Sequence, residues 1–267
     1  MAARIIHGYY ISFIAVLAAM GMYSRLIWDV MVVSLVRPPR WGLIREQLYN
    51  IGVLSLPVVA ITGISTGLIL ATQSYFQLVD LGMVGATGLL VGKSMVTELG
   101  PILTAVMVTG RVGAAMCAEL GTMQVSEQVD ALRSMSVNPL RYLVAPRFIA
   151  GTLMLPPLTI FSMAMGIVGG YIISVFFFHI SSVTYLDPMP QHISRFDLSS
   201  GIIKSFCFGI IIVTISCYKG LTTRGGAAGV GRATTTSVVI CYSVILFTNF
   251  ILNLLLNLLH RQFFPWL

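Results

Sequence analysis

The sequence predicts an all-α integral membrane protein, and its composition, hydropathy and charge spacing each support that class. Of its 267 residues, 57% are hydrophobic and only 9% are charged, whereas a soluble domain carries roughly 25% charged residues. The mean hydropathy is +0.90. Five apolar runs are each long enough to cross a hydrocarbon core about 30 Å thick. These properties argue against a water-soluble enzyme.

The amino-terminal region, residues 1–45, fits two descriptions. Residues 5–24 are uncharged, but His7, Gly8 and Ser12 interrupt the run. A transmembrane span and a helix lying in the membrane interface both accommodate this pattern. No small-residue cleavage site precedes a soluble segment, so a removed signal peptide is not expected. Residues 46–267 are taken as one membrane domain.

The first clear span is the charge-free run from Gln47 to Val79, in which Gly63 and Gly67 permit close helix packing. A second span lies within residues 81–118. Its apolar sequence is interrupted by three ionisable residues, Lys93, Glu98 and Arg111. Because a charge at the centre of a membrane helix is costly, this segment must face protein or water rather than lipid.

Three further apolar stretches give the remaining spans. Residues 148–186 exceed one bilayer crossing but lack a polar turn, which indicates one span and an apolar extension that follows the membrane. Leu198–Tyr218, which includes Lys204, gives the fourth span and Ala233–His260 the fifth. Most Lys and Arg residues fall on one side of this arrangement, so the positive-inside rule places the amino terminus in the cytoplasm.

The net charge of +7 reflects this topology rather than nucleic-acid binding, because the basic residues lie between the apolar runs. We expect no nucleic-acid partner. The four cysteines, Cys117, Cys207, Cys217 and Cys241, have neither CxxC spacing nor a nearby histidine. They predict packing residues, with no metal site and no disulfide framework.

Two motifs resemble catalytic or nucleotide-binding signatures only weakly. GISTG at residues 63–67 matches GxSxG around Ser65, with His179 the available base, but it lies within a span and is more typical of helix packing. KGLTTRGGAAGVGRATT has phosphate-loop glycine spacing at Gly226 and Gly231, but Arg232 and Ala233 replace the Lys and the Ser or Thr. We interpret it as a connector, so any ATP must bind to a partner.

A polar segment between the second and third spans predicts a short helix over about residues 125–136. Val125, Val129 and Leu132 recur at helical spacing, and Glu127, Asp130 and Arg133 recur on the other side. Asn138–Pro139 then forms a cap and first-turn pair for the next helix. Periodicity alone allows either a surface connector or a helix that inserts into a groove of a cytoplasmic partner.

The same region resembles a known family. TELGPILTAVMVTGRVGAAMCAELGTMQVSEQVDALRSMSVNPLRYLVAPR is similar to the signature of the MlaE (YrbE) permeases, the membrane subunits of ABC transporters that act with MCE-domain lipid-binding proteins. QLYNIGVLSLPVVAITGISTGLILATQSY resembles the family's first span. GIIKSFCFGIIIVTISCYKGLTTRGGAAGVGRATTTSVV resembles its last two spans and their connecting loop. The resemblance extends over about residues 46–249.

This resemblance implies a homodimer, each subunit having five spans, an amino-terminal interfacial helix and a cytoplasmic coupling helix. It implies a partner ATPase that supplies ATP and Mg²⁺, a periplasmic MCE hexamer and, in some members, a STAS-domain protein. The implied substrate is a phospholipid. The implied location is a bacterial inner membrane, with the plastid inner envelope as the alternative, and the implied role is outer-membrane lipid homeostasis.

Residue by residue, the resemblance assigns ATPase contact to Glu127, Asp130 and Arg133. It assigns a lipid cavity to Leu70, Gln73, Leu78, Glu98 and Leu99. Family members often have Arg immediately before this Glu, where this chain has Thr97. Two alternatives follow: Lys93 supplies the missing positive charge, or Glu98 is neutral because a desolvated carboxyl without a partner has a raised pKa.

Two other functions remain as alternatives. The first is an ion-gradient-driven secondary transporter or channel that uses Lys93, Glu98 and Arg111 as intramembrane charges. It would be expected to show an internal repeat, and the sequence has no convincing one. The second is a membrane hydrolase centred on Ser65, which would be labelled by a serine-directed probe.

Overall fold

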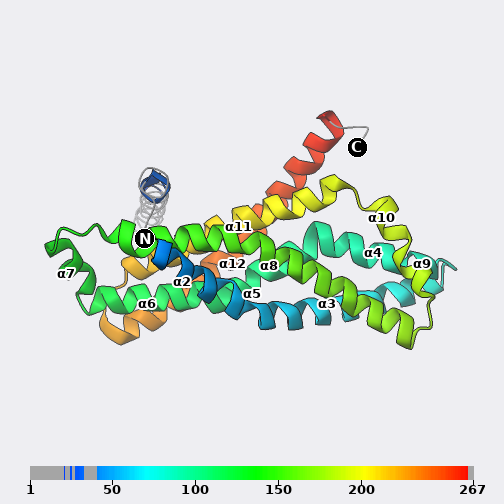
Figure 1. Cartoon of the computed structure of the whole chain (residues 1–267), viewed down its shortest axis with the longest axis horizontal. Helices are drawn as coiled ribbons and strands as arrows, with labels where there is room; N and C mark the ends of the chain where they lie inside the picture. The colour runs from blue at the N-terminus through cyan, green and yellow to red at the C-terminus, as the bar shows by residue number, and fades with distance from the viewer. Residues whose placement is uncertain (1–20, 22–24, 26–27, 33–40, 264–267) are drawn as a thin grey trace, which may run out of the picture.

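The computed structural model describes residues 21, 25, 28–32 and 41–263, and every regular element within those ranges is a helix (Figure 1). Five helical stretches are long and apolar enough to cross a membrane: Trp41–Val79, Val84–Val125, Leu140–Phe177, Arg195–Leu221 and Gly226–His260. The predicted all-α membrane fold with five spans is therefore confirmed. The interfacial helix expected within residues 1–45 lies largely outside the described residues, although Val30 is buried in the main core.

The first two stretches each consist of consecutive helical segments. The first contains α2 (Trp41–Ile51), η1 (Val53–Ser55) and α3 (Leu56–Val79). The second contains η2 (Val84–Ala86), α4 (Thr87–Ser94), η3 (Met95–Leu99), α5 (Gly100–Val108), η4 (Thr109–Gly113) and α6 (Ala114–Val125). Pro57 and Pro101 are the second residues of α3 and α5, at the points where the chain changes from one helical segment to the next.

The rest of the chain contains three long helices and several short ones. After α7 (Gln128–Ser134) come η5 (Leu140–Val144), α8 (Ala145–Ile172) and η6 (Ile173–Phe177). Next are α9 (Ser182–Leu186), α10 (Pro188–His192), α11 (Arg195–Leu221) and α12 (Gly226–Phe263). The apolar extension expected beyond the third span is thus α9, which with α10 packs against α4.

Glycine contacts join α3 to α8. A Cβ atom added to Gly67 would overlap the carbonyl oxygen of Gly166, and one added to Gly169 would overlap that of Ile64. Such close backbone approach is typical of small-residue motifs in membrane helices. Ser65, the serine of the GISTG motif, is exposed. The structure therefore accounts for GISTG as a packing motif.

α11 lies against α6, α8 and α12, and these helices together supply much of the main core. The end of α12 projects beyond the main bundle (Figure 1), and there His260 stacks on Phe196 of α11. Large apolar side chains are exposed along α12, among them Phe247, Phe250, Leu254, Leu255 and Leu258. An apolar surface of this kind is suited to contact with lipid or with another protein chain.

Candidate functional site

Two π-helical segments interrupt the second span, and each contains one of its ionisable residues. η3 includes Glu98 and η4 includes Arg111. A π turn contains one residue more than an α turn and frequently occurs at functional sites. The extra residue changes the direction in which the following side chains leave the helix. The two charges are thus placed at local irregularities of an otherwise apolar helix.

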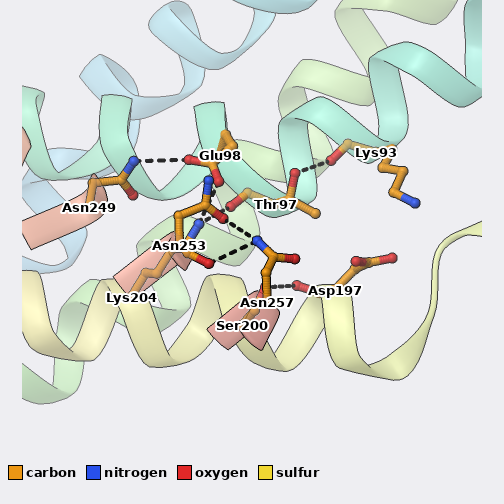
Figure 2. Close-up of polar contacts among 9 residues, drawn as sticks. All are labelled: Lys93, Thr97, Glu98, Asp197, Ser200, Lys204, Asn249, Asn253 and Asn257. Carbon is orange, nitrogen blue, oxygen red and sulfur yellow. Dashed lines mark hydrogen bonds and ion pairs between the residues drawn. The ribbon is translucent and has the colours of Figure 1, made fainter. Parts of the chain in front are cut away.

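Glu98 connects three helices (Figure 2). Its Oε1 accepts a hydrogen bond from Lys204 Nζ of α11 at 2.7 Å, and its Oε2 accepts one from Asn249 Nδ2 of α12 at 2.9 Å. Lys204 Nζ also donates to the carbonyl oxygen of Thr97 at 2.9 Å. The Lys204 side chain is only 1% exposed, while that of Glu98 is 32% exposed. A buried ammonium requires such pairing, because its desolvation is otherwise uncompensated.

The partner of Glu98 was not anticipated. Sequence reasoning offered Lys93 or a neutral Glu98, whereas the structure pairs Glu98 with Lys204. Lys93 is exposed, and its side chain points away from Glu98 (Figure 2). Lys93 lies five residues earlier on the same helical stretch and faces a different side, whereas α11 brings Lys204 directly opposite. The sequence does contain one indication that Lys204 pairs with another charge, because it is the single charged residue in the run Leu198–Tyr218.

The ion pair borders a polar cavity of about 570 Å³. Six residues contribute ionisable groups to its lining: Lys93, Glu98, His192, Asp197, Lys204 and His260. Amides complete one wall, where Asn257 Nδ2 donates to the carbonyl and to the side-chain oxygen of Asn253 at 2.8 and 2.9 Å. Cationic and amide groups together can bind a polar, charged group such as a phosphate ester. The cavity lies where α4, α11 and the final turns of α12 meet (Figure 2).

An apolar groove of about 600 Å³ lies on α3 and η6. It is lined by Leu68, Ile69, Thr72, Gln73, Phe76, Gln77 and Ile173. Its surface is largely hydrocarbon, so it is suited to an acyl chain. Among the five predicted cavity residues, only Gln73 lines this groove.

The other predicted cavity residues lie elsewhere in the single chain. Leu70 and Leu99 pack together against the small core cluster of Ala71, Val91 and Met95. Leu78 is buried, and Glu98 lines the polar cavity. The structure therefore places Leu70 and Leu99 against one small cluster, and Ile173, which packs on that cluster, also lines the groove with Gln73.

The helix predicted over residues 125–136 is shorter in the structure. α6 continues through Val125, and α7 begins only at Gln128, because Glu127 adopts a left-handed backbone conformation with φ of 59°. Val129 is fully buried and anchors α7 to the main core. Glu127, Asp130 and Arg133 are all exposed. The segment thus has one anchored face and one free charged face.

The charges on α7 are available to another molecule. Asp130 Oδ1 and Arg133 Nη1 are 2.9 Å apart, and both side chains are more than half exposed. An ion pair this exposed contributes little to stability, about 0–1 kcal/mol. It can therefore exchange partners at low cost. Asn138, downstream of α7, caps the next helix as predicted, since its Oδ1 accepts from Leu140 N at 2.9 Å.

A buried arginine connects the helices on either side of α7. Arg147 Nη2 donates to Glu119 Oε2 at 2.9 Å, and its Nη1 donates to the Leu143 carbonyl. The Arg147 side chain is 9% exposed. Arg147 stands immediately before the long uncharged run of residues 148–186, and the sequence gives no indication of its partner. This contact links the end of α6 with the start of α8.

The family model described as Permease MlaE matches residues 44–255. The chain belongs to the MlaE permease family. It is similar to a probable ABC transporter permease of Rickettsia bellii, with 43% identity over 223 residues, 83% of this chain and 86% of the relative. This MlaE-family chain is thus a permease subunit of the ABC transporter class and a multi-pass membrane protein.

Two further relatives have more specific names. The intermembrane phospholipid transport system permease protein MlaE of Haemophilus influenzae is 35% identical over 79% of this chain and 81% of the relative. The chloroplastic protein TRIGALACTOSYLDIACYLGLYCEROL 1 of Arabidopsis thaliana is 38% identical over 80% of this chain and 61% of the relative. Within the described part of this MlaE permease, no group of three His, Cys, Asp or Glu side chains is arranged to hold a metal ion.

Proposed function

We propose that this MlaE-family permease moves phospholipids between the inner membrane of a double-membraned bacterium and periplasmic MCE proteins, and so contributes to outer-membrane lipid homeostasis. The match over residues 44–255 is the observation that carries the proposal. The name of the Haemophilus relative supports a phospholipid substrate. The chloroplastic relative makes a plastid inner envelope the alternative location.

The proposed assembly contains two copies of the chain with their amino termini in the cytoplasm. Each copy contacts a cytoplasmic ATPase that binds ATP and Mg²⁺. An MCE-protein hexamer lies on the periplasmic side, and a STAS-domain protein accompanies the ATPase in some assemblies. The exposed apolar surfaces of α3 and α12 support association of two copies around a shared lipid cavity. In that dimer, Leu70, Gln73, Leu78, Glu98 and Leu99 would line the cavity.

The proposed route of coupling begins at α7. Glu127, Asp130 and Arg133 contact the ATPase, while the buried Val129 transmits the displacement of α7 to the core. The contact between Arg147 and Glu119 makes α6 and α8 move together. Through α5 and the two π segments, this movement reaches Glu98 and changes the shape of the polar cavity. Rigid-body displacement of packed helices is an established means of such coupling.

The test is affinity purification of a tagged chain from its native membrane in mild detergent. Wild type is compared with a variant in which Glu127, Asp130 and Arg133 are all alanine, and copurified ATPase and phospholipid are measured. The matched control is the Asp80, Asp187 and Arg195 triple-alanine variant. It also removes two acidic groups and one basic group, from exposed positions away from α7.

We expect wild type and the control to retain the ATPase and the α7 variant to lose it, while all three retain phospholipid. Equal retention of ATPase by all three proteins would contradict the assignment of α7. An absence of ATPase from wild type in several detergents would contradict the ABC assembly itself. In that case, transport by the purified chain under an ion gradient would favour the secondary transporter.

A further inference from the structure

A second polar cavity lies between the end of α11 and the first turns of α12. It has a volume of about 370 Å³ and is lined by Lys219, Thr222, Thr223, Arg224, Gly225, Gly229, Arg232, Ala233 and Thr236. Lys219 is 15 residues beyond Lys204 on α11, a separation of about 22 Å at 1.5 Å per residue. The cavity is therefore distinct from the site around Glu98.

The lining of this cavity is strongly basic. Lys219, Arg224 and Arg232 all contribute to it, and none of the acidic residues that the structure describes does. In the part of the chain that the structure describes, none of these three side chains forms a salt bridge. Like charges gathered without a counterion repel one another, so a bound anion would be favoured by all three. Lysine and arginine are also the side chains that most often bind phosphate.

The threonine hydroxyls of the cavity are not free to donate hydrogen bonds to an anion. The hydroxyls of Thr222, Thr223 and Thr236 donate to the carbonyl oxygens of Tyr218, Lys219 and Arg232 respectively. Their donors are therefore already used by backbone acceptors. The positive charge of the three basic side chains remains available for a ligand.

Glycines determine the shape of the cavity. Gly225 and Gly226 have φ values of +92° and +67°, a conformation that L side chains rarely adopt. At Gly229, an added Cβ would overlap the carbonyl oxygen of Arg224, so glycine lets the turn fold back against α12. Gly231 and Arg232 lie within α12 itself, not in a loop. The segment therefore differs from a nucleotide phosphate loop. Its glycines shape the cavity, and Lys219, Arg224 and Arg232 give the cavity its positive charge.

The cavity is also in contact with the helix that leads to α7. A Cβ added to Gly121 of α6 would lie 3.1 Å from Thr223 Oγ1, and α6 ends four residues later, at Val125. The α11–α12 turn thus packs directly on the final turns of α6. A ligand held by this turn would also stabilise the position of α6.

We propose that this basic cavity binds a phosphate group, either the headgroup phosphate of an anionic lipid or free inorganic phosphate, and that its occupancy holds the α11–α12 turn against α6. This site lies at the α7 end of the bundle and is therefore separate from the proposed cavity for the transported lipid. The proposal concerns binding by this chain and does not depend on the identity of the ATPase or of the periplasmic partner.

The test uses the purified full chain in nanodiscs and measures its thermal unfolding. Discs of phosphatidylcholine alone are compared with discs containing about a third phosphatidylglycerol, each with sodium phosphate or with sodium chloride at equal ionic strength. Arg224 and Arg232 are replaced together by glutamine. The charge-matched control is Arg45→Gln with Arg141→Gln, two exposed arginines outside the cavity lining.

A ligand that binds only the folded protein raises its midpoint temperature, by an amount that depends on its concentration relative to Kd. We expect anionic lipid or phosphate to raise the midpoint of wild type and of the control by several degrees, and not that of the Arg224 and Arg232 variant. Stabilisation by phosphatidylglycerol alone identifies a lipid headgroup as the ligand. Stabilisation by phosphate in phosphatidylcholine discs identifies the free anion. Equal shifts in both variants, or no shift in wild type, would overturn the proposal.

Discussion

Replacement of Lys204 by methionine should strongly destabilise the protein, because it leaves Glu98 without its cationic partner. Loss of one member of a fully buried ion pair costs about 3–5 kcal/mol. Glu98 is 32% exposed and keeps its hydrogen bond from Asn249. Because partial solvation lowers the cost, we expect a loss of about 2–3 kcal/mol.

The assay is unfolding of the purified chain by sodium dodecyl sulfate in mixed micelles, with a double-mutant cycle. The second single variant is Glu98→Gln, and the double variant combines both changes. The double variant should recover much of the loss caused by Lys204→Met, because it contains no unpaired buried charge. Two results would refute the reasoning: a Lys204→Met protein as stable as wild type, or a double variant whose losses are simply additive.

Three further predictions concern packing, the α7 anchor and one tyrosine. Gly67→Ala forces α3 away from Gly166 and should cost about 1–3 kcal/mol by the same unfolding assay. Gly42→Ala, whose added Cβ meets no atom of the described residues within 4 Å, should be tolerated. Val129→Ala removes two buried methyl groups and should lower the free energy that holds α7 on the core by about 1.5 kcal/mol. Amide hydrogen exchange in α7 should then accelerate roughly tenfold. Unchanged exchange would argue against Val129 as the anchor. Burial raises the pKa of Tyr185 in α9 above its ordinary value of 10.0. Because the unfolded chain releases this proton first, stability should fall as pH rises above 10, and a Tyr185→Phe variant should show a shallower fall.

The sequence predicted the spans because each depends on local composition. A charge-free run such as Gln47–Val79 has to be helical in a membrane, since hydrocarbon provides no partner for its backbone groups. The cap at Asn138 was equally local, because its side chain reaches a backbone N–H two residues away. The boundaries of α7 were harder to predict. The left-handed conformation of Glu127 separates α6 from α7 in a sequence whose periodicity continues unbroken.

The polar contacts were less predictable, because they join residues far apart in the sequence. Glu98 and Lys204 are 106 positions apart, and Glu98 and Asn249 are 151 apart. Lys93 is close to Glu98 in sequence but lies on another side of the helix. The contact between Glu119 and Arg147 spans 28 residues across α7. Only the packing of α6, α8, α11 and α12 decides which charges meet.

The sequence by itself determined that the chain is an all-α membrane protein with five spans, and its motifs indicated the MlaE permease family. These conclusions follow from hydropathy and from contiguous blocks of residues, both of which are properties of the chain in order. The tertiary structure alone decided that Lys204 neutralises Glu98, that Gly63 and Gly67 face α8, and that three basic residues gather between α11 and α12. Such contacts form only when the helices pack. A charge buried in the membrane must pair with a group on another helix, and a small residue allows close approach only where a second helix lies against it.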